Sequence, residues 1–152
     1  MSLLNTFDPA TTKKTLERLD QLSNTTKPQW GKMNSAQMLA HLSVAYDLAY
    51  GTTQSKVNPF AKLMLKFFVK NIVVSETPYK RNSRTAPDFV IADERNFENE
   101  KARLAAHIKE TEAKGAAYFE GKESSSFGVM TSKEWSNQFY KHLDHHFTQF
   151  GV

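Results

Sequence analysis

The chain contains no cysteine among its 152 residues. This absence excludes disulfide bonds, iron–sulfur clusters, thiolate zinc sites and a cysteine nucleophile. Any metal ion that the protein binds must therefore be held by nitrogen and oxygen atoms.

A long apolar run and a strong charge surplus are also missing. The longest apolar stretch, residues 63–74, is interrupted by Lys66, Lys70 and Asn71 and is shorter than the roughly 18 residues needed to cross a bilayer. The first ten residues lack the basic-then-apolar order of a signal peptide. The net charge of +4 permits acidic partners without requiring them. We therefore expect a cytoplasmic protein with neither a membrane nor a nucleic-acid partner.

Length and composition fit one globular domain over residues 1–152. Hydrophobic residues make up 39% of the chain and charged residues 24%, which is typical of a folded protein rather than a disordered one. A chain of this length can bury about two-thirds of its unfolded surface in a single core.

Helix signals dominate the sequence. Asp8 before Pro9, Asn34 with Gln37, and Thr131 with Glu134 have the spacing of helix N-termini. The strand signals at 72–74 and 89–91 are too short to build a sheet. We predict an extended connection over residues 75–92 and a loop over residues 121–128. We predict an all-α helical bundle with helices near 9–24, 34–51, 60–72, 93–114 and 131–150.

Three of the five histidines lie on apolar helix faces. With Trp135 as the origin of the last helix and about 100° per residue, His142 and His146 fall at about −20° and 20°, beside the apolar stripe, and His145 falls on its flank. His41 lies within the apolar stripe of the second predicted helix. An i, i+4 histidine pair can bind one ion, and a third imidazole from a facing helix would complete a three-nitrogen site.

The alternative for each histidine is a core residue that donates to a backbone carbonyl. A lone buried histidine favours that alternative, but three together need three separate partners, whereas one divalent metal ion satisfies them all. Other site motifs are absent: the residue after His142 is Leu143, which excludes H-E-x-x-H, and there is no di-iron motif, phosphate-binding loop or nucleophile elbow. We expect His107 to be a solvated surface residue.

The sequence resembles the DinB/YfiT-like superfamily, specifically a branch of domains of unknown function, over nearly the whole chain. The resemblance is most specific at H-L-D-H-H-F-T-Q-F-G (residues 142–151), which contains the H-x-x-x-H-x-x-Q signature. The other matching blocks are W-G-K-M-N-S-A-Q-M-L-A-H-L (30–42), T-A-P-D-F (85–89), F-E-N-E-K-A-R-L (97–104) and S-F-G-V-M-T-S-K-E-W (126–135).

This resemblance implies a four-helix up-down-down-up bundle, with a long crossover that carries an extra short helix between the second and third helices. It also implies a homodimer. It further implies a divalent metal ion bound by His41, His142 and His146, with Gln149 supporting these ligands without binding the ion itself. The sequence departs from the family at Ser125-Ser126, where we would expect His-Pro.

Three neutral imidazoles suit zinc or nickel, with iron as a further option, and they leave coordination positions open. The expected function is a metal-dependent hydrolase, or an S-transferase that uses a low-molecular-weight thiol, acting on a small-molecule substrate. Asp47 is a weak candidate for a general base, and Tyr46 and Tyr50 are expected to be packing residues.

Residues 62–70 suggest an alternative, non-catalytic function. Lys62, Lys66 and Lys70 are stacked beside apolar side chains, so this amphipathic helix could contact a membrane surface, a partner helix or the second subunit of a dimer. With Lys80, Arg81 and Arg84, it could also form a weak nucleic-acid patch, although such faces are more often simply solvated. The alternative function is thus a dimeric helical-bundle binding protein.

Overall fold

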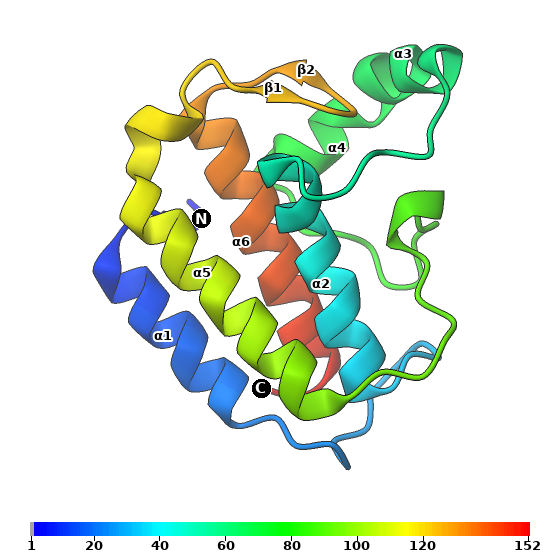
Figure 1. Cartoon of the computed structure of the whole chain (residues 1–152), viewed down its shortest axis with the longest axis vertical. Helices are drawn as coiled ribbons and strands as arrows, with labels where there is room; N and C mark the ends of the chain where they lie inside the picture. The colour runs from blue at the N-terminus through cyan, green and yellow to red at the C-terminus, as the bar shows by residue number, and fades with distance from the viewer. Residues whose placement is uncertain (1) are drawn as a thin grey trace.

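The computed structural model describes residues 2–152 and is mostly helical (Figure 1). Within that range the chain forms six α-helices, one 3₁₀ turn and a two-stranded hairpin. In chain order these are α1 (Pro9–Asp20), α2 (Ser35–Tyr50), α3 (Pro59–Phe68), α4 (Lys70–Val74), η1 (Pro87–Phe89), α5 (Phe97–Phe119), β1 (Glu123–Ser124), β2 (Gly128–Val129) and α6 (Ser132–Gln149).

The two helices that carry the candidate histidines begin as predicted. Asn34 and Gln37 form a reciprocal capping box at the start of α2, and Thr131 and Glu134 form the same box at the start of α6. The α2 helix ends at Gly51, whose left-handed φ of 70° closes the last turn. These local signals fix the two helices because each side chain satisfies backbone N–H groups that the helix leaves free.

The predicted helix over 60–72 is wrong in one respect, because the structure divides it at Val69 into α3 and α4. Two side chains of α6 hold α4: the Asn137 amide donates to the Val74 carbonyl, and the Lys141 ammonium donates to the carbonyls of Ile72, Ser75 and Thr77. None of the α3 residues is buried. Long-range hydrogen bonds thus dock α4 on α6, while α3 projects from the body of the protein (Figure 1).

Two other predicted boundaries differ from the structure. The first helix ends at Asp20 rather than near residue 24, and the helix predicted over 93–114 runs as α5 from Phe97 to Phe119. Gly115 interrupts α5 with φ 72° and ψ 174°, but helical backbone resumes after it and brings the fully buried Phe119 into the core. Gly115 therefore breaks the helix where its stop signal was predicted, and burial of the Phe119 ring holds the short helical segment that follows.

The predicted loop over 121–128 contains a short antiparallel hairpin. Glu123 pairs with Val129, and Ser124 pairs with Gly128. Ser124 also accepts hydrogen bonds from the backbone N–H groups of Ser126 and Phe127 through its hydroxyl. The hairpin lies at the N-terminal end of α6, so the unusual Ser125-Ser126 sequence is at the other end of that helix from His142 and His146 (Figure 1).

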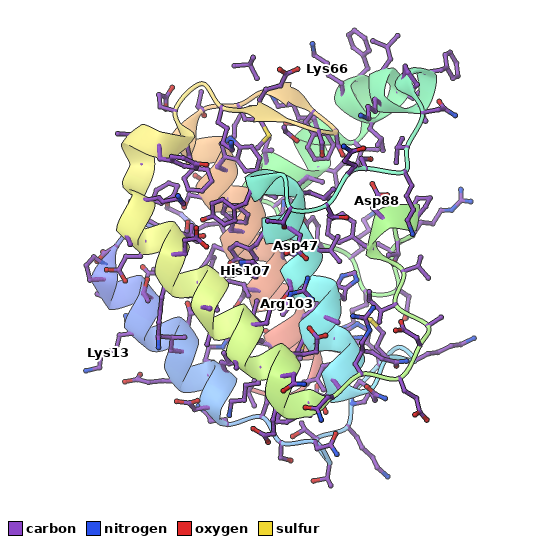
Figure 2. All side chains as sticks on the ribbon, in the orientation of Figure 1. Lys13, Asp47, Lys66, Asp88, Arg103 and His107 are labelled. Carbon is purple, nitrogen blue, oxygen red and sulfur yellow. The ribbon has the colours of Figure 1, made fainter. Side chains whose placement is uncertain are left out.

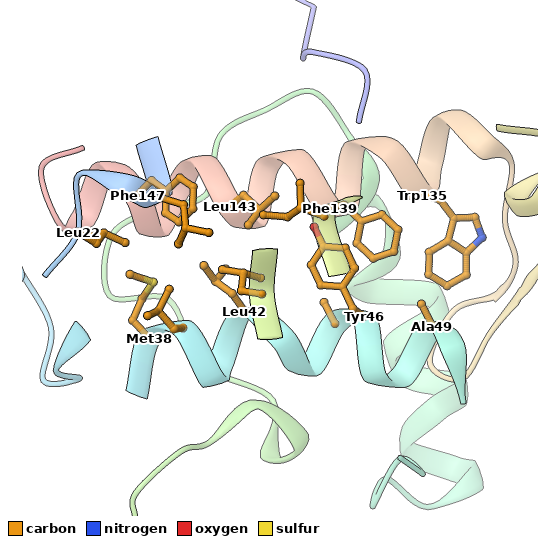
Figure 3. Packing of buried hydrophobic residues seen from close by; sticks show 14 of the residues in the cluster. Leu22, Met38, Leu42, Tyr46, Ala49, Trp135, Phe139, Leu143 and Phe147 are labelled. Atoms are coloured by element: carbon orange, nitrogen blue, oxygen red, sulfur yellow. The ribbon is translucent and has the colours of Figure 1, made fainter. Parts of the chain in front are cut away.

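The core fills the space between α2, α5 and α6, and α1 packs on the outer side of α5 (Figure 1). Figure 3 shows apolar side chains of α2 and α6 facing one another along the length of both helices. Tyr46 stacks on Phe139 at 4.6 Å, as expected for a packing residue. None of the helices within residues 2–152 is long and apolar enough to cross a membrane.

Candidate metal centre

Three histidines from α2 and α6 converge, as the helix periodicity predicts. The two helices run antiparallel, which places His41 of α2 level with His142 and His146 of α6 (Figure 1). The centroids of the three rings are 4.6 to 5.0 Å apart. One ring nitrogen from each residue lies within 4.8 Å of the others, so the cluster could hold a metal ion.

The ring of His41 is oriented by the backbone of η1. Its Nδ1 lies 2.7 Å from the Phe89 carbonyl oxygen. Because a carbonyl can only accept, Nδ1 must carry the proton, and the lone pair of the neutral ring is therefore on Nε2. The long connection between α4 and α5 thus fixes the tautomer of a side chain on α2.

The ring of His146 is oriented in the same way by Gln149. Nδ1 of His146 lies 2.7 Å from Oε1 of Gln149, while the Gln149 amide nitrogen donates to the Trp30 carbonyl at 2.7 Å. The second bond fixes the amide so that its oxygen faces His146, and the imidazole must therefore donate from Nδ1. The lone pair of His146 is then on Nε2, as in His41.

All three imidazoles are neutral at pH 7. Loss of solvation lowers the pKa of His41, against the opposing effect of the hydrogen bond to Phe89. The same cause, followed by the charges of His41 and His146, holds the pKa of His142 well below its usual value. Burial lowers the pKa of His146 to about 3. Neutral imidazole is the form that coordinates metals, so the cluster requires no deprotonation before binding.

The spacing of the nitrogens suits coordination. Nε2 of His142 lies 2.9 Å from Nε2 of His41, and two imidazoles bound at 2.0–2.1 Å to one ion have nitrogens roughly 3.0–3.4 Å apart. His41 and His146 are buried, whereas His142 is half-buried. The cluster could therefore hold one metal ion, with His142 as its least buried member.

Aromatic side chains from three other segments surround the cluster. Phe89 packs edge-on to both His41 and His142, and His145 packs edge-on to His146 at 5.0 Å. Trp30 and Tyr79 in turn contact the His145 ring at 5.8 and 5.7 Å. None of these residues could be assigned to the site from the sequence. His145 lies on the flank of α6, and Trp30, Tyr79 and Phe89 lie in connections whose return to the bundle has no local signal.

The expectation for His107 is wrong. Its ring stacks on Tyr46 at 5.2 Å, and its Nε2 lies 3.2 Å from the Asp47 carboxylate, which also pairs with Arg103. Figure 2 shows Asp47, Arg103 and His107 together between α2 and α5. Asp47 is six residues from His41 and thus on a different side of α2, where its carboxylate is occupied by Arg103, His107 and Thr52. Asp47 therefore has no contact with the three histidines.

Comparison with known proteins places the chain in a family whose activity is not assigned. The family model described as "Protein of unknown function (DUF1569)" matches residues 5–151. No curated protein and no solved structure gives a match. The match covers every helix, the hairpin and all three clustered histidines. The chain therefore belongs to the DUF1569 family of proteins of unknown function.

Proposed function

We propose that the protein is a metal-dependent enzyme in which Nε2 of His41, His142 and His146 binds one divalent ion. The observation that carries this proposal is the pair of hydrogen bonds that fix tautomers, from His41 to the Phe89 carbonyl and from His146 to Gln149. A packing role would need only one hydrogen bond per ring. In His41 and His146 that hydrogen bond is made by Nδ1, so the lone pair of each ring is on Nε2 and is directed toward a common point. Metal-binding histidines are held in this way.

The donor set restricts the ion and the chemistry. Three neutral nitrogens with no carboxylate favour zinc or nickel, with iron as a further option. When bound, such an ion acts as a Lewis acid that can activate water for hydrolysis, or a low-molecular-weight thiol for S-transfer to a small substrate. The chain itself brings no carboxylate to the cluster, since Asp47 is paired with Arg103 and His107. Its own residues would orient the ion and limit solvent around it.

The same proposal extends to the fold. We propose that α1, α2, α5 and α6 correspond to the up-down-down-up bundle of the DinB/YfiT-like superfamily, with α3 and α4 in the crossover. The order of these four helices, the packing of α5 against α1, α2 and α6, and the packing of α2 against α6 support this assignment.

Elemental analysis of the purified chain, before and after loading with zinc or nickel, tests the metal proposal. We expect about one ion per chain, lost in His41→Ala and His146→Ala, and a rise in melting temperature on metal addition. The matched control is His107→Gln, which removes a half-buried histidine outside the cluster and should keep the ion. Retention of full metal content by both cluster variants would contradict the proposal.

A screen of the metal-loaded protein against esters, with and without thiol cosubstrates, separates a hydrolase from an S-transferase.

A second candidate is a non-catalytic role in which two chains associate through α3. Phe60, Phe67 and Phe68 are 73%, 70% and 68% exposed. The Lys66 side chain lies beside Gly128, where an added Cβ would be 3.5 Å from its Nζ, and Lys70 pairs with Glu134. These two charges are therefore directed at the protein's own surface. The exposed face is therefore apolar rather than basic, which favours another apolar surface over an anionic membrane.

The size of this face fits a dimer. The exposed apolar side chains of α3 and α4, namely Phe60, Leu63, Met64, Phe67, Phe68 and Ile72, present on the order of 600 Å². A standard interface buries about 800 Å² per partner, so pairing with a second copy of α3 would be of the right order. Light scattering should give the mass of two chains for the wild type and one chain for Phe67→Asp. Val90→Asp, which alters an exposed apolar residue outside α3, is the control. A monomeric wild type would exclude this candidate.

A further inference from the structure

Arg81 is held over the indole of Trp30 beside the three-histidine cluster. Its guanidinium carbon lies 4.2 Å from the centroid of the Trp30 ring. Stacking on an indole restrains a guanidinium but leaves the N–H groups at its edge free to donate. Arg81 is exposed, and the stacking contact restrains its guanidinium, so the contact preorganises a donor.

The stacked pair is linked to the cluster through one further ring. Trp30 contacts His145 edge-on at 5.8 Å, and His145 contacts His146 edge-on at 5.0 Å. The Trp30 carbonyl also accepts from Gln149, the residue that orients His146. Three contacts therefore lead from Arg81 to a proposed metal ligand, through the rings of Trp30 and His145.

The guanidinium has no carboxylate partner in the part of the chain that the structure describes. Residues 77–86 contain Lys80, Arg81 and Arg84 but no acidic residue. The nearest acids in the sequence are engaged elsewhere: Glu76 pairs with Lys133, and Asp88 accepts from the Ser55 hydroxyl and the Lys56 backbone N–H. The Arg81 guanidinium is thus available to bind a ligand.

We propose that the substrate is a small carboxylate, whose reactive end reaches the three-histidine centre while its carboxylate accepts hydrogen bonds from Arg81. This inference rests on the proposed metal function. A guanidinium presents paired N–H donors that match the two oxygens of a carboxylate, and a charge-assisted pair of this kind contributes more than a neutral hydrogen bond.

The test uses the full chain loaded with cobalt(II) and two thiols that differ in one end group, 3-mercaptopropionate and 2-mercaptoethanol. The thiolate-to-cobalt absorption band reports binding at the metal for both. We expect 3-mercaptopropionate to bind at least about 10-fold more tightly, because its carboxylate adds a charge-assisted interaction. In Arg81→Ala this advantage should fall below about 3-fold, and Arg81→Lys should keep part of it. Lys80→Ala, which removes an equal charge from an adjacent exposed residue, should keep it all.

The outcomes separate this inference from the metal proposal. An unchanged advantage in Arg81→Ala, or no advantage in the wild type, overturns the carboxylate inference, while the mercaptoethanol band still supports the metal centre. Competition by inorganic phosphate that is stronger than competition by acetate also overturns it, in favour of a phosphate-bearing ligand. Failure of the protein to retain cobalt overturns both proposals, and the absence of a band with either thiol on cobalt-loaded protein overturns the inference about Arg81.

Discussion

Gln149 accepts a hydrogen bond from Nδ1 of His146 at 2.7 Å, three residues before it on α6. The same amide donates to the Trp30 carbonyl, so a residue in the N-terminal third of the chain controls the orientation of a ring near the C-terminus. Both bonds are short and the amide is buried, which leaves it one arrangement. The orientation of His146 therefore depends on Gln149 and, through it, on the Trp30 backbone.

Replacement of Gln149 by Leu should weaken metal binding without removing a ligand. The variant keeps the size of the side chain but frees Nδ1 of His146, so either nitrogen can carry the proton and the ring can rotate. Loss of a hydrogen bond of this kind costs roughly 10- to 100-fold in metal affinity. Competition with a chelator of known affinity measures the change. Equal affinities of Gln149→Leu and the wild type would show that the amide does not orient the ligand.

Gly31 should be required for the placement of Gln149. Its φ of 84° disfavours any L side chain, and a Cβ at this position would lie 2.6 Å from the Gln149 amide nitrogen. Gly31→Ala should therefore displace the amide from the Trp30 carbonyl and reduce metal affinity along with stability. Gly121→Ala is the control, because Gly121 has a similar φ of 73° but nothing within 4 Å. If both variants lose stability but neither loses metal affinity, Gly31 has no role in the centre.

Acidification should destabilise the metal-free protein. Burial lowers the pKa of His41, His142 and His146, to about 3 for His146, whereas an unfolded histidine titrates near its ordinary value. Below about pH 6.5 the unfolded chain binds protons that the folded cluster rejects, so stability is present above this pH and falls as the pH falls. His146, whose pKa is lowered to about 3, contributes up to about 2 kcal/mol between pH 6.5 and 5.

Urea denaturation at several pH values measures this dependence, with His146→Gln as the comparison. The variant should show a shallower decline than the wild type, because it has one fewer buried imidazole. Saturating metal should move the decline to lower pH, since the ion competes with protons for the same nitrogens. Identical pH profiles for the wild type and His146→Gln would contradict the assignment of a strongly lowered pKa to this residue.

Lys141 should be essential for the connection between α4 and the following segment. Its buried ammonium donates to the carbonyls of Ile72, Ser75 and Thr77 at 2.6 to 2.8 Å. Lys141→Met leaves these carbonyls without their donor and should lower the free energy of unfolding by about 2–4 kcal/mol. Lys133→Met, at a 73% exposed side chain of the same helix, should change it by less than about 0.5 kcal/mol. A similar, small effect of both would contradict the role of Lys141.

The parts of the structure that depend on neighbouring residues could be predicted from the sequence. The capping boxes at Asn34 and Thr131 fixed the starts of α2 and α6, and the helical repeat then placed His41, His142 and His146 on facing sides. Periodicity suffices for these residues because a regular helix converts spacing in sequence into direction in space. Convergence of the three rings is therefore the most predictable feature of the site.

The parts that depend on distant contacts could not be predicted. The division of α3 from α4 at Val69 follows from bonds made by Asn137 and Lys141, more than 60 residues away. His107 falls beside the apolar stripe of α5, and only the position of Asp47 on α2 shows that its ring is held between the helices. The Phe89 carbonyl belongs to the backbone, so no side-chain pattern marks it as a partner of His41.

X-ray absorption spectroscopy of the protein loaded with zinc or nickel tests whether His41, His142 and His146 bind one ion, because it counts imidazole ligands and measures their distances. We expect three imidazole nitrogens at about 2.0–2.1 Å, falling to two in His142→Ala, with lighter oxygen scatterers at the remaining positions. A spectrum without imidazole scattering, or one that is unchanged in His142→Ala, would contradict this expectation.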